Sequence, residues 1–221
     1  MPPLLSLKKQ IVRLVYPFRS SFIDRLNRVP TFVDFARSNK HAPMFDRREE
    51  IYDWLELEIC AGPIDYLEFG VSAGDSIRYW SLLNQHPQSR FIGFDSFEGL
   101  PEPWGDRKRG AYGTGGSPPH CDDPRVQFVK GLFQESLESF LREFRSRSQL
   151  VVHADADLYA STLYVLTRID PLLGPGSIVI FDEFGDVQHE FRAFEDYCAA
   201  YCKSWHVVAA TGRFETVAFI T

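Results

Sequence analysis

From Asp65 onward, short apolar runs alternate with stretches of helical pattern, and this alternation restricts the fold more than any other feature of the chain. Strands that alternate with helices predict βαβ units, and hence a mostly parallel sheet covered on both faces. The last two apolar runs are joined too closely for a parallel crossover, so they should pair antiparallel. We therefore expect an α/β fold, a doubly wound sheet that ends in a C-terminal hairpin. The expected strands are 66–69, 90–94, 126–129, 150–153, 177–181, 205–210 and 216–220, and the expected helices are 46–59, 75–83, 136–144, 161–172 and 189–201.

The first forty residues differ from the rest because they are strongly basic. They carry eight lysines and arginines against two aspartates, Asp24 and Asp34, and a loosely helical apolar pattern that Pro17 interrupts. We divide the chain into a helical N-terminal extension, 1–45, and a main domain, 46–221. A basic amphipathic segment can touch a membrane surface. We favour an arm that packs on its own domain or joins two copies into a homo-oligomer.

Composition excludes several classes of function. The net charge of −6 argues against sequence-independent nucleic-acid binding, which needs a dense basic surface. No apolar run approaches the roughly 18 residues of a membrane span. Cys198 and Cys202 stand at helical spacing but lack nearby His or Cys ligands, so buried thiols are favoured over a metal site. Scattered cysteines indicate a reducing compartment, and we expect a cytoplasmic protein.

Two strand ends carry residues suited to an adenosine-containing ligand. The first strand runs into Glu68, Phe69, Gly70, Val71, Ser72, Ala73 and Gly74, where the glycines let the backbone turn tightly and approach a ligand. The dinucleotide fingerprint is incomplete, because Ser72 stands at its middle glycine. Asp95 ends the second strand, where a carboxylate can accept both ribose hydroxyls. An ordinary turn and a helix N-cap are the alternative interpretations of these residues.

Acidic residues follow two later strands. Asp155 ends the strand 150–153, and Asp182 and Glu183 end the strand 177–181. If these strands are neighbours, their ends lie about 5 Å apart. Carboxylates at so short a distance repel one another and need a cation to neutralise them. Oxygen ligands select hard ions such as Mg²⁺, Ca²⁺ or Mn²⁺. Asp157 is either a further ligand or a group that orients one, and helix capping is the alternative for all four acids.

Three linked segments resemble the macrocin O-methyltransferase family, over roughly residues 42–194. The resemblance implies a class I, Rossmann-like fold with seven strands, S-adenosylmethionine near Glu68, Gly70, Ser72, Asp95 and Ser96, and Mg²⁺ on the acids after the fourth and fifth strands. It also implies that the loop with Trp104, Tyr112 and His120 lines or covers the acceptor site. The family has paired aspartates where this chain has Asp182 and Glu183, so the coordination can differ. The matching segments are 67–71, 93–102 and 155–162.

These features together predict transfer of a methyl group from S-adenosylmethionine to a hydroxyl of a small molecule, with Mg²⁺ assistance. Asp155 is the expected catalytic residue, as proton acceptor or metal ligand. A nicotinamide-dependent oxidoreductase would also use Asp95 to bind a ribose. The middle glycine of the fingerprint, which Ser72 replaces, and the acids after the fourth and fifth strands count against this alternative. A non-catalytic assembly protein on the same scaffold is the remaining alternative.

Overall fold

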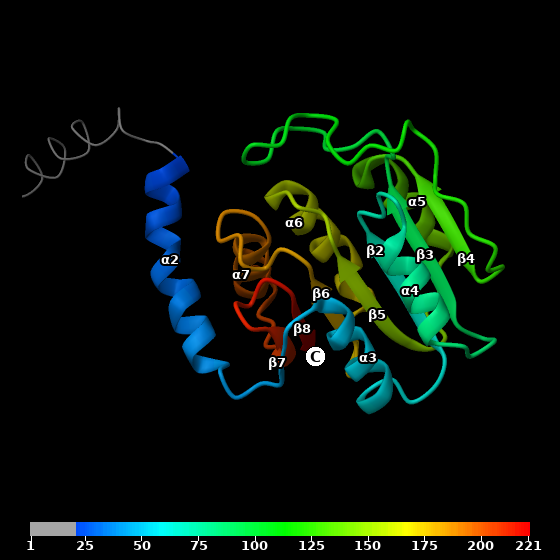
Figure 1. Ribbon diagram of the computed structural model, residues 1–221, viewed down its shortest axis with the longest axis horizontal. Coiled ribbons are helices and arrows are strands. Elements are labelled where there is room, and N and C mark those ends of the chain that lie inside the picture. Colours follow the sequence, from blue (N-terminus) through cyan, green and yellow to red (C-terminus); the bar gives the residue numbers. More distant parts are fainter. Residues whose placement is uncertain (1–20) are drawn as a thin grey trace, which may run out of the picture.

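The computed structural model describes residues 21–221, and these form one mixed sheet with helices on both faces (Figure 1). The strand order is β1-β7-β8-β6-β5-β2-β3-β4, and only β8 runs antiparallel to its neighbours β6 and β7. The strands are β1 (Met44–Phe45), β2 (Ile64–Phe69), β3 (Arg90–Asp95), β4 (Val126–Lys130), β5 (Gln149–Ala154), β6 (Ile178–Phe181), β7 (His206–Thr211) and β8 (Val217–Ile220).

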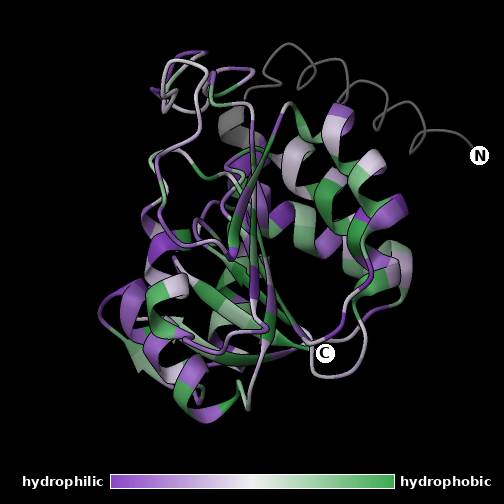
Figure 2. Ribbon diagram, turned by 90° about the vertical axis from the view of Figure 1, so that its right-hand side faces the viewer, coloured by the Kyte–Doolittle hydropathy of each residue, from purple (hydrophilic) through white to green (hydrophobic). Residues whose placement is uncertain are grey.

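The helices divide between the two faces of the sheet according to the core residues they contact. Helices α3 (Arg48–Glu58) and α4 (Asp75–Leu83) cover one face. The other face is covered by α2 (Ser21–Ser38), α5 (Phe133–Glu143), α6 (Tyr159–Ile169) and α7 (Glu190–Tyr201). Figure 2 shows hydrophobic and hydrophilic residues alternating along these helices, as expected for helices that bury one side only.

The expected α/β fold with an antiparallel C-terminal hairpin is confirmed. The difference is one additional strand, β1, so that the described residues form eight strands instead of seven. Strand β1 is two residues long and pairs in parallel with β7 at the edge of the sheet. Two residues are too few to show an alternating pattern in a sequence, so β1 had no readable signal.

The described part of the N-terminal extension contains helix α2 and strand β1, and α2 packs against the main core. The Phe35 ring lies 5.2 Å from that of Phe184 and 5.8 Å from that of Phe191, and Phe32 meets Phe191 edge-on at 5.2 Å. Burying aromatic rings of this size contributes about 2 kcal/mol each. The apolar pattern before Pro17 lies outside the described residues. Within them, no helix is long and apolar enough to cross a membrane.

Asp65 fastens the start of β2 to the turn before β5. Its side chain is fully buried and accepts hydrogen bonds from Arg90 Nε at 2.7 Å, Ser146 Oγ at 3.0 Å and the Arg147 N–H at 2.7 Å. Burial alone would raise the pKa of this carboxyl, but the donors, Arg90 first, hold it below the ordinary value of 3.8. Asp65 is therefore a structural acid far from the strand ends that matter for ligands.

We expect Asp65→Asn to lower the free energy of unfolding by about 2–3 kcal/mol near neutral pH, because charge-assisted hydrogen bonds are lost. A depressed folded-state pKa contributes stability that is present above the unfolded pKa and is lost as pH falls through the folded pKa. The measurement is urea unfolding of both proteins from pH 7 to pH 2.5. The difference in their free energies of unfolding should become smaller as the pH falls below 3.8, the ordinary pKa of an aspartate. A difference in the free energy of unfolding that stays constant with pH would contradict the stabilising role of the ionised Asp65 carboxylate.

Candidate active site

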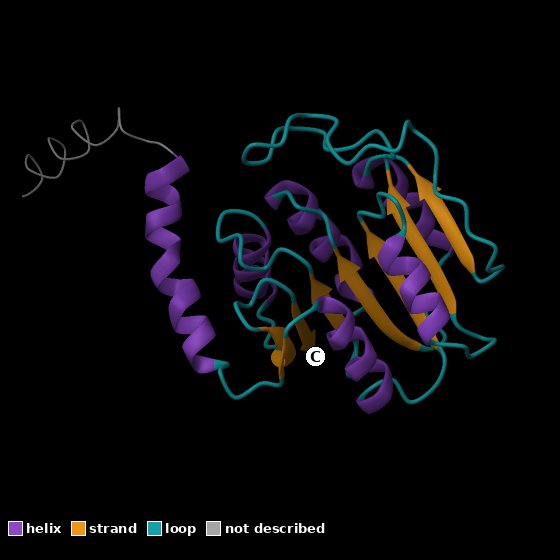
Figure 3. Cartoon of the chain, viewed as in Figure 1, coloured by secondary structure: helices purple, strands orange, loops and turns teal. Residues whose placement is uncertain are grey.

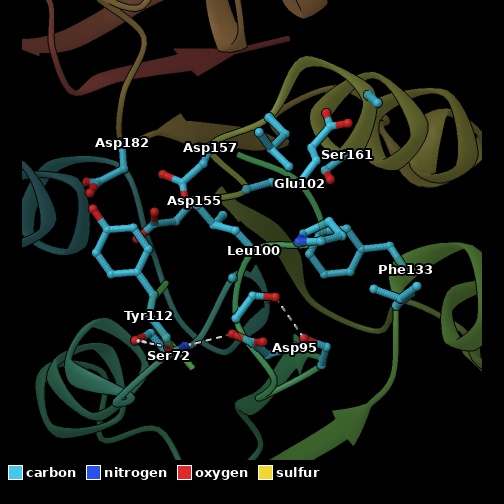
Figure 4. Close-up of a pocket in the computed structure, with 18 of the residues that line it drawn as sticks. Ser72, Asp95, Leu100, Glu102, Tyr112, Phe133, Asp155, Asp157, Ser161 and Asp182 are labelled. Carbon is cyan, nitrogen blue, oxygen red and sulfur yellow. Dashed lines mark hydrogen bonds between the residues drawn. The ribbon is translucent and has the colours of Figure 1, made fainter. Parts of the chain in front are cut away.

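One cavity of about 440 Å³ opens at the carboxyl ends of the central strands. It lies where the strand order reverses, between β2 and β5, which is the usual ligand position in an open α/β sheet. Its size suits a small-molecule ligand. Figure 4 shows the cavity with Asp155, Asp157 and Asp182 on one side and Ser72 and Asp95 on another. Its polar lining residues include Arg48, Ser72, Asp95, Ser96, Glu102, Tyr112, Asp155, Asp157, Ser161, Asp182 and Glu183.

Asp95 ties together the loops that follow β2 and β3. One carboxylate oxygen accepts the N–H groups of Val71 at 2.9 Å and Ser72 at 2.8 Å, and the other accepts the Phe97 N–H at 2.7 Å. A carboxylate can accept about four hydrogen bonds, so the oxygen facing Phe97 retains capacity for a ligand hydroxyl. Asp95 therefore both shapes the cavity wall and lines it.

Gly70 allows the loop after β2 to pass directly against the end of β5. Its φ is +100°, and a Cβ atom there would lie 1.7 Å from the Asp155 carbonyl oxygen. The backbone is also joined at this point, because the Asp155 N–H donates to the Phe69 carbonyl at 2.9 Å. The glycine expected from the sequence is thus required by a close approach of two backbones.

The seven residues expected around the cofactor separate into two groups. Gly70, Ser72, Asp95 and Ser96 line the cavity. Glu68, Phe69 and Gly74 do not. Glu68 is 1% exposed and accepts a hydrogen bond from Tyr66 at 2.6 Å, Phe69 stacks on Phe94 at 4.8 Å, and Gly74 is the N-cap of α4 with φ +80°.

The three acids expected to bind a metal all line the cavity. Ala154 of β5 is paired with Phe181 of β6, so the next residues, Asp155 and Asp182, leave the sheet side by side. Asp182 and Glu183 follow β6 directly, and Asp182 lies beside α3, where it pairs with Arg48. The described residues place single oxygens of Asp155, Asp157 and Glu183 within 4.8 Å of one another.

Asp182 has cationic neighbours of its own. Arg48, the first residue of α3, places Nη1 2.5 Å from Asp182 Oδ2 and 3.9 Å from Asp155 Oδ2. His153 Nε2 lies 3.8 Å from Asp182 Oδ1. The Asp182 side chain is 8% exposed. Burial would raise its pKa, but His153 and Arg48 outweigh burial and lower it below 3.8, so Asp182 is ionised.

His153 is a fully buried histidine between two carboxylates. The Tyr66 hydroxyl donates to Glu68, so His153 Nδ1, 2.9 Å away, donates to the Tyr66 oxygen. Burial would lower the pKa of His153, yet the carboxylates of Asp182 and Glu68, each 3.8 Å from a ring nitrogen, raise it to about 10. His153 therefore lies in the core, and its ring is cationic there.

The remaining acids of the cavity have raised pKa values, in contrast to Asp182. Burial, and then the charges of neighbouring acids, raises the pKa of Asp157 to about 7 and that of Glu183 to about 10, and raises that of Asp155 well above 3.8. Glu183 Oε2 is also buried without a hydrogen-bond partner among the described residues. A group of carboxyls whose negative charge is this unfavourable is chemically suited to a bound cation.

Three residues lining the cavity have left-handed backbones although they are not glycine. These are Ser72 with φ +46°, Tyr112 with φ +65° and Asp157 with φ +56°. Such conformations cost of order 1 kcal/mol each and concentrate at functional sites. The position of Asp157 is therefore imposed by its surroundings and is not a relaxed turn.

A long loop joins β3 to β4 over residues 96–125, and it arches over the carboxyl ends of the strands (Figure 3). Tyr112 lines the cavity, and its carbonyl accepts a hydrogen bond from Ser72 Oγ at 3.2 Å. Trp104 Nε1 donates to Asp186 at 3.1 Å beside α7. His120 is 86% exposed and does not line the cavity.

Arg48 and residues 131–134, which follow β4, also line the cavity, and no sequence feature had pointed to them. Arg48 begins the helix that follows β1, and a two-residue strand gives no pattern that would place its neighbours at the strand ends. His189 is the N-cap residue of α7, and its Nδ1 accepts the Tyr159 N–H at 3.1 Å, at the start of α6. The acids were readable because each directly follows a long apolar strand.

Known proteins resemble this chain in sequence and in fold. A family model described as a methyltransferase domain matches residues 67–184, which is more than half of the chain. A Streptomyces olivaceus enzyme, 8-demethyl-8-(2,3-dimethoxy-alpha-L-rhamnosyl)-tetracenomycin-C 4'-O-methyltransferase, is 28% identical over 156 residues. That alignment covers 59% of this chain and 58% of the enzyme, so the similarity spans little more than half of its length.

Two solved structures share the fold. CalS11, a calicheamicin methyltransferase, superposes over 100% of this chain and 93% of its own with a TM-score of 0.62 and 22% identity. The O-methyltransferase NovP superposes over 78% of each chain with a TM-score of 0.59 and 22% identity. The cavity lies within the matched segment except for Arg48, and the chain belongs to the methyltransferase-domain family.

Proposed function

We propose that this chain is an S-adenosylmethionine-dependent, Mg²⁺-assisted O-methyltransferase that acts on a hydroxyl of a small molecule, such as a sugar or a natural product. One observation carries the proposal. The Asp95 loop and the acid cluster, which are the two halves such a reaction needs, face the same cavity. An oxidoreductase would use the Asp95 loop but has no use for several acids opposite it.

The residues present fit the proposed cofactor. Asp95 keeps hydrogen-bonding capacity for a ribose hydroxyl, and Gly70 and Ser72 bring backbone to the cavity wall. Leu100, Leu132 and Phe133 supply an apolar lining against which an adenine ring can pack. S-adenosylmethionine, when bound, supplies a methyl group on a sulfonium centre.

The residues also fit a divalent cation. Several carboxylate oxygens converge, and one buried Glu183 oxygen lacks a partner among the described residues. Mg²⁺, when bound, polarises the acceptor hydroxyl and lowers its pKa. Asp155 lies where it can hold the hydroxyl in line with the methyl group or accept its proton. The loop with Trp104 and Tyr112 covers the cavity and excludes water from the reacting groups.

The acceptor class rests on the similar proteins. The name of the Streptomyces olivaceus relative states that it methylates the 4' hydroxyl of a rhamnosyl group. CalS11 is described as a TDP-rhamnose 3'-O-methyltransferase. Both acceptors are sugar hydroxyls, and we infer the same chemical class for this chain.

The metal requirement is tested by incubating the protein with S-adenosylmethionine and a panel of glycosylated and other hydroxylated acceptors, with and without EDTA. We expect chelation to lower the rate by about 100-fold or more, since Lewis-acid stabilisation is worth several kcal/mol, and added Mg²⁺ should restore it. Equal rates under both conditions would remove the metal from the proposal. Calorimetry with S-adenosylmethionine alone tests cofactor binding separately.

A further inference from the structure

Three consecutive cations on the long loop, Arg107, Lys108 and Arg109, have no acidic partner. All three are exposed. Within residues 24–221 none of them forms an ion pair, although acidic residues outnumber basic ones in the chain by 30 to 24. A cationic segment without counter-charges in an acidic protein attracts an external anion. We call residues 107–109 the cationic segment.

Backbone hydrogen bonds hold the cationic segment beside the cavity. The Leu100 N–H donates to the Ala111 carbonyl at 2.9 Å, and the Gly110 N–H donates to the Leu100 carbonyl at 2.9 Å. The loop is therefore closed at its base by a residue that lines the cavity. Nearer the tip, the N–H groups of Trp104 and Arg107 each donate to the other's carbonyl, at 3.0 and 2.8 Å. This tight turn fixes where the cationic segment begins.

Arg107 lies next to residues that line the cavity. Its guanidinium carbon is 5.6 Å from the centre of the Tyr112 ring, which lines the cavity in Figure 4. Burial raises the pKa of Asp157, another lining residue, and the nearby positive charge of Arg107 opposes that effect. A guanidinium stacked on an aromatic face keeps its N–H groups free in its own plane. That geometry suits two parallel hydrogen bonds to an oxyanion.

The interior of the cavity is unfavourable for an anionic part of an acceptor. Among the described residues that line it, Arg48 is the only lysine or arginine, and it is already paired with Asp182. An acceptor whose hydroxyl faces the acids would therefore place an anionic group outward, at Arg107. The acidic lining residues are Asp95, Glu102, Asp155, Asp157, Asp182 and Glu183.

We propose that the acceptor carries a phosphate group, and that Arg107, with Lys108 and Arg109 beside it, binds this group at the mouth of the cavity. Three adjacent cations match the charge of about −2 on a phosphate ester or the larger charge of a diphosphate, whereas one arginine suffices for a carboxylate.

This inference rests on the proposed function and narrows its acceptor to a sugar phosphate or a nucleoside diphosphate sugar. It also places the methylation in a reaction sequence. Transfer of a sugar from phosphate to another molecule breaks the bond between the sugar and the phosphate. Methylation of the phosphorylated sugar therefore precedes such a glycosyl transfer.

The first test is a calorimetric titration of the full chain with inorganic pyrophosphate in buffer that contains EDTA, so that no metal ion bridges pyrophosphate to the acids. We expect the wild type to bind pyrophosphate and Arg107→Gln to weaken binding by about 10-fold or more, because a charge-assisted pair is lost. Arg142→Gln is the matched control. Arg142 is exposed on the last turn of α5, away from the cavity, and its loss should change the dissociation constant by less than about 2-fold.

The second test compares three acceptors that carry the same sugar: its 1-phosphate, its nucleoside diphosphate ester and its methyl glycoside. We expect the wild type to prefer the phosphorylated acceptors. Arg107→Gln should lower the ratio of kcat/KM for a phosphorylated acceptor to that for the methyl glycoside by about 10-fold or more. The change should fall mainly on KM, since the phosphate is bound equally before and during the reaction. The faster of the two phosphorylated acceptors identifies the source of the phosphate.

The inference is overturned if the wild type binds no pyrophosphate, if Arg107→Gln binds it as tightly as the wild type, or if the wild type prefers the methyl glycoside. It is also overturned if Arg107→Gln weakens S-adenosylmethionine binding while the acceptor ratio stays unchanged, because Arg107 would then bind the carboxylate of the cofactor. Failure of the proposed function is distinguishable as absent methyl transfer to every acceptor, since the pyrophosphate titration contains neither cofactor nor acceptor. Thermal unfolding checks that each variant is folded.

Discussion

Asp155→Asn is expected to reduce methyl transfer by about 1,000-fold or more, which corresponds to about 4 kcal/mol of transition-state stabilisation. Asp155 has an oxygen within 4.8 Å of ligand atoms of His153 and Asp182, and likewise of Asp157 and Glu183. It also stands beside Gly70, where the loop after β2 begins. Under the proposed function, neutralising it removes a metal ligand and a proton acceptor together. S-adenosylmethionine affinity, measured by calorimetry, should stay within about 3-fold, since Asp95 and its loop are untouched.

The control for this prediction is Asp122→Asn, the same chemical change at a side chain 93% exposed on the long loop. It should leave turnover unchanged. Turnover by Asp155→Asn at more than about one tenth of the wild-type rate would remove Asp155 from the mechanism. Loss of cofactor binding together with turnover would instead assign Asp155 to cofactor binding.

Gly70→Ala is expected to have the largest effect on stability. A Cβ atom at this position would lie 1.7 Å from the Asp155 carbonyl oxygen, and the φ of +100° disfavours any L side chain. The ends of β2 and β5 would have to separate. We expect the free energy of unfolding to fall by about 3 kcal/mol or more, and cofactor affinity to fall with it because the loop after β2 shifts.

Gly62→Ala is the matched control, because a Cβ there meets nothing within 4 Å. Its stability should change by less than about 1 kcal/mol, and an increase is the expected direction, since alanine restricts the unfolded chain. Chemical denaturation of both variants measures the difference. Equal stabilities would show that the backbones at Gly70 are not in rigid contact.

Much of the fold was predictable because its strands are long and apolar enough to be recognised one at a time. Strand β6, with four buried residues, and β5, with five, leave little alternative to a covered parallel sheet. Helix boundaries were less accurate. Helix α5 begins at Phe133, three residues before the expected start, because Leu132 at its N-cap is not a polar capping residue. Strand β1 is too short for any pattern.

Site residues could be predicted from the sequence where they directly follow, or end, a recognisable strand. Asp95, Asp155 and Asp182 all line the cavity for this reason. Two facts depended on tertiary packing. Glu183, although adjacent to Asp182 in the sequence, places a carboxylate oxygen within 4.8 Å of oxygens of Asp155 and Asp157. Arg48 then arrives from a separate segment to pair with Asp182. Glu68 belongs to a buried network with Tyr66 instead of to the cavity wall.

The start of α3 has a consequence for comparing related chains. Residues 67–184 carry the sequence signature of the family, yet Arg48, which sets the charge beside Asp182, lies nineteen positions before that segment. Under the proposed function, two chains with identical signature residues can therefore differ in metal affinity, according to which amino acid begins this helix. Exchanging the segment before β2 between relatives would transfer that property without altering any residue by which the family is recognised.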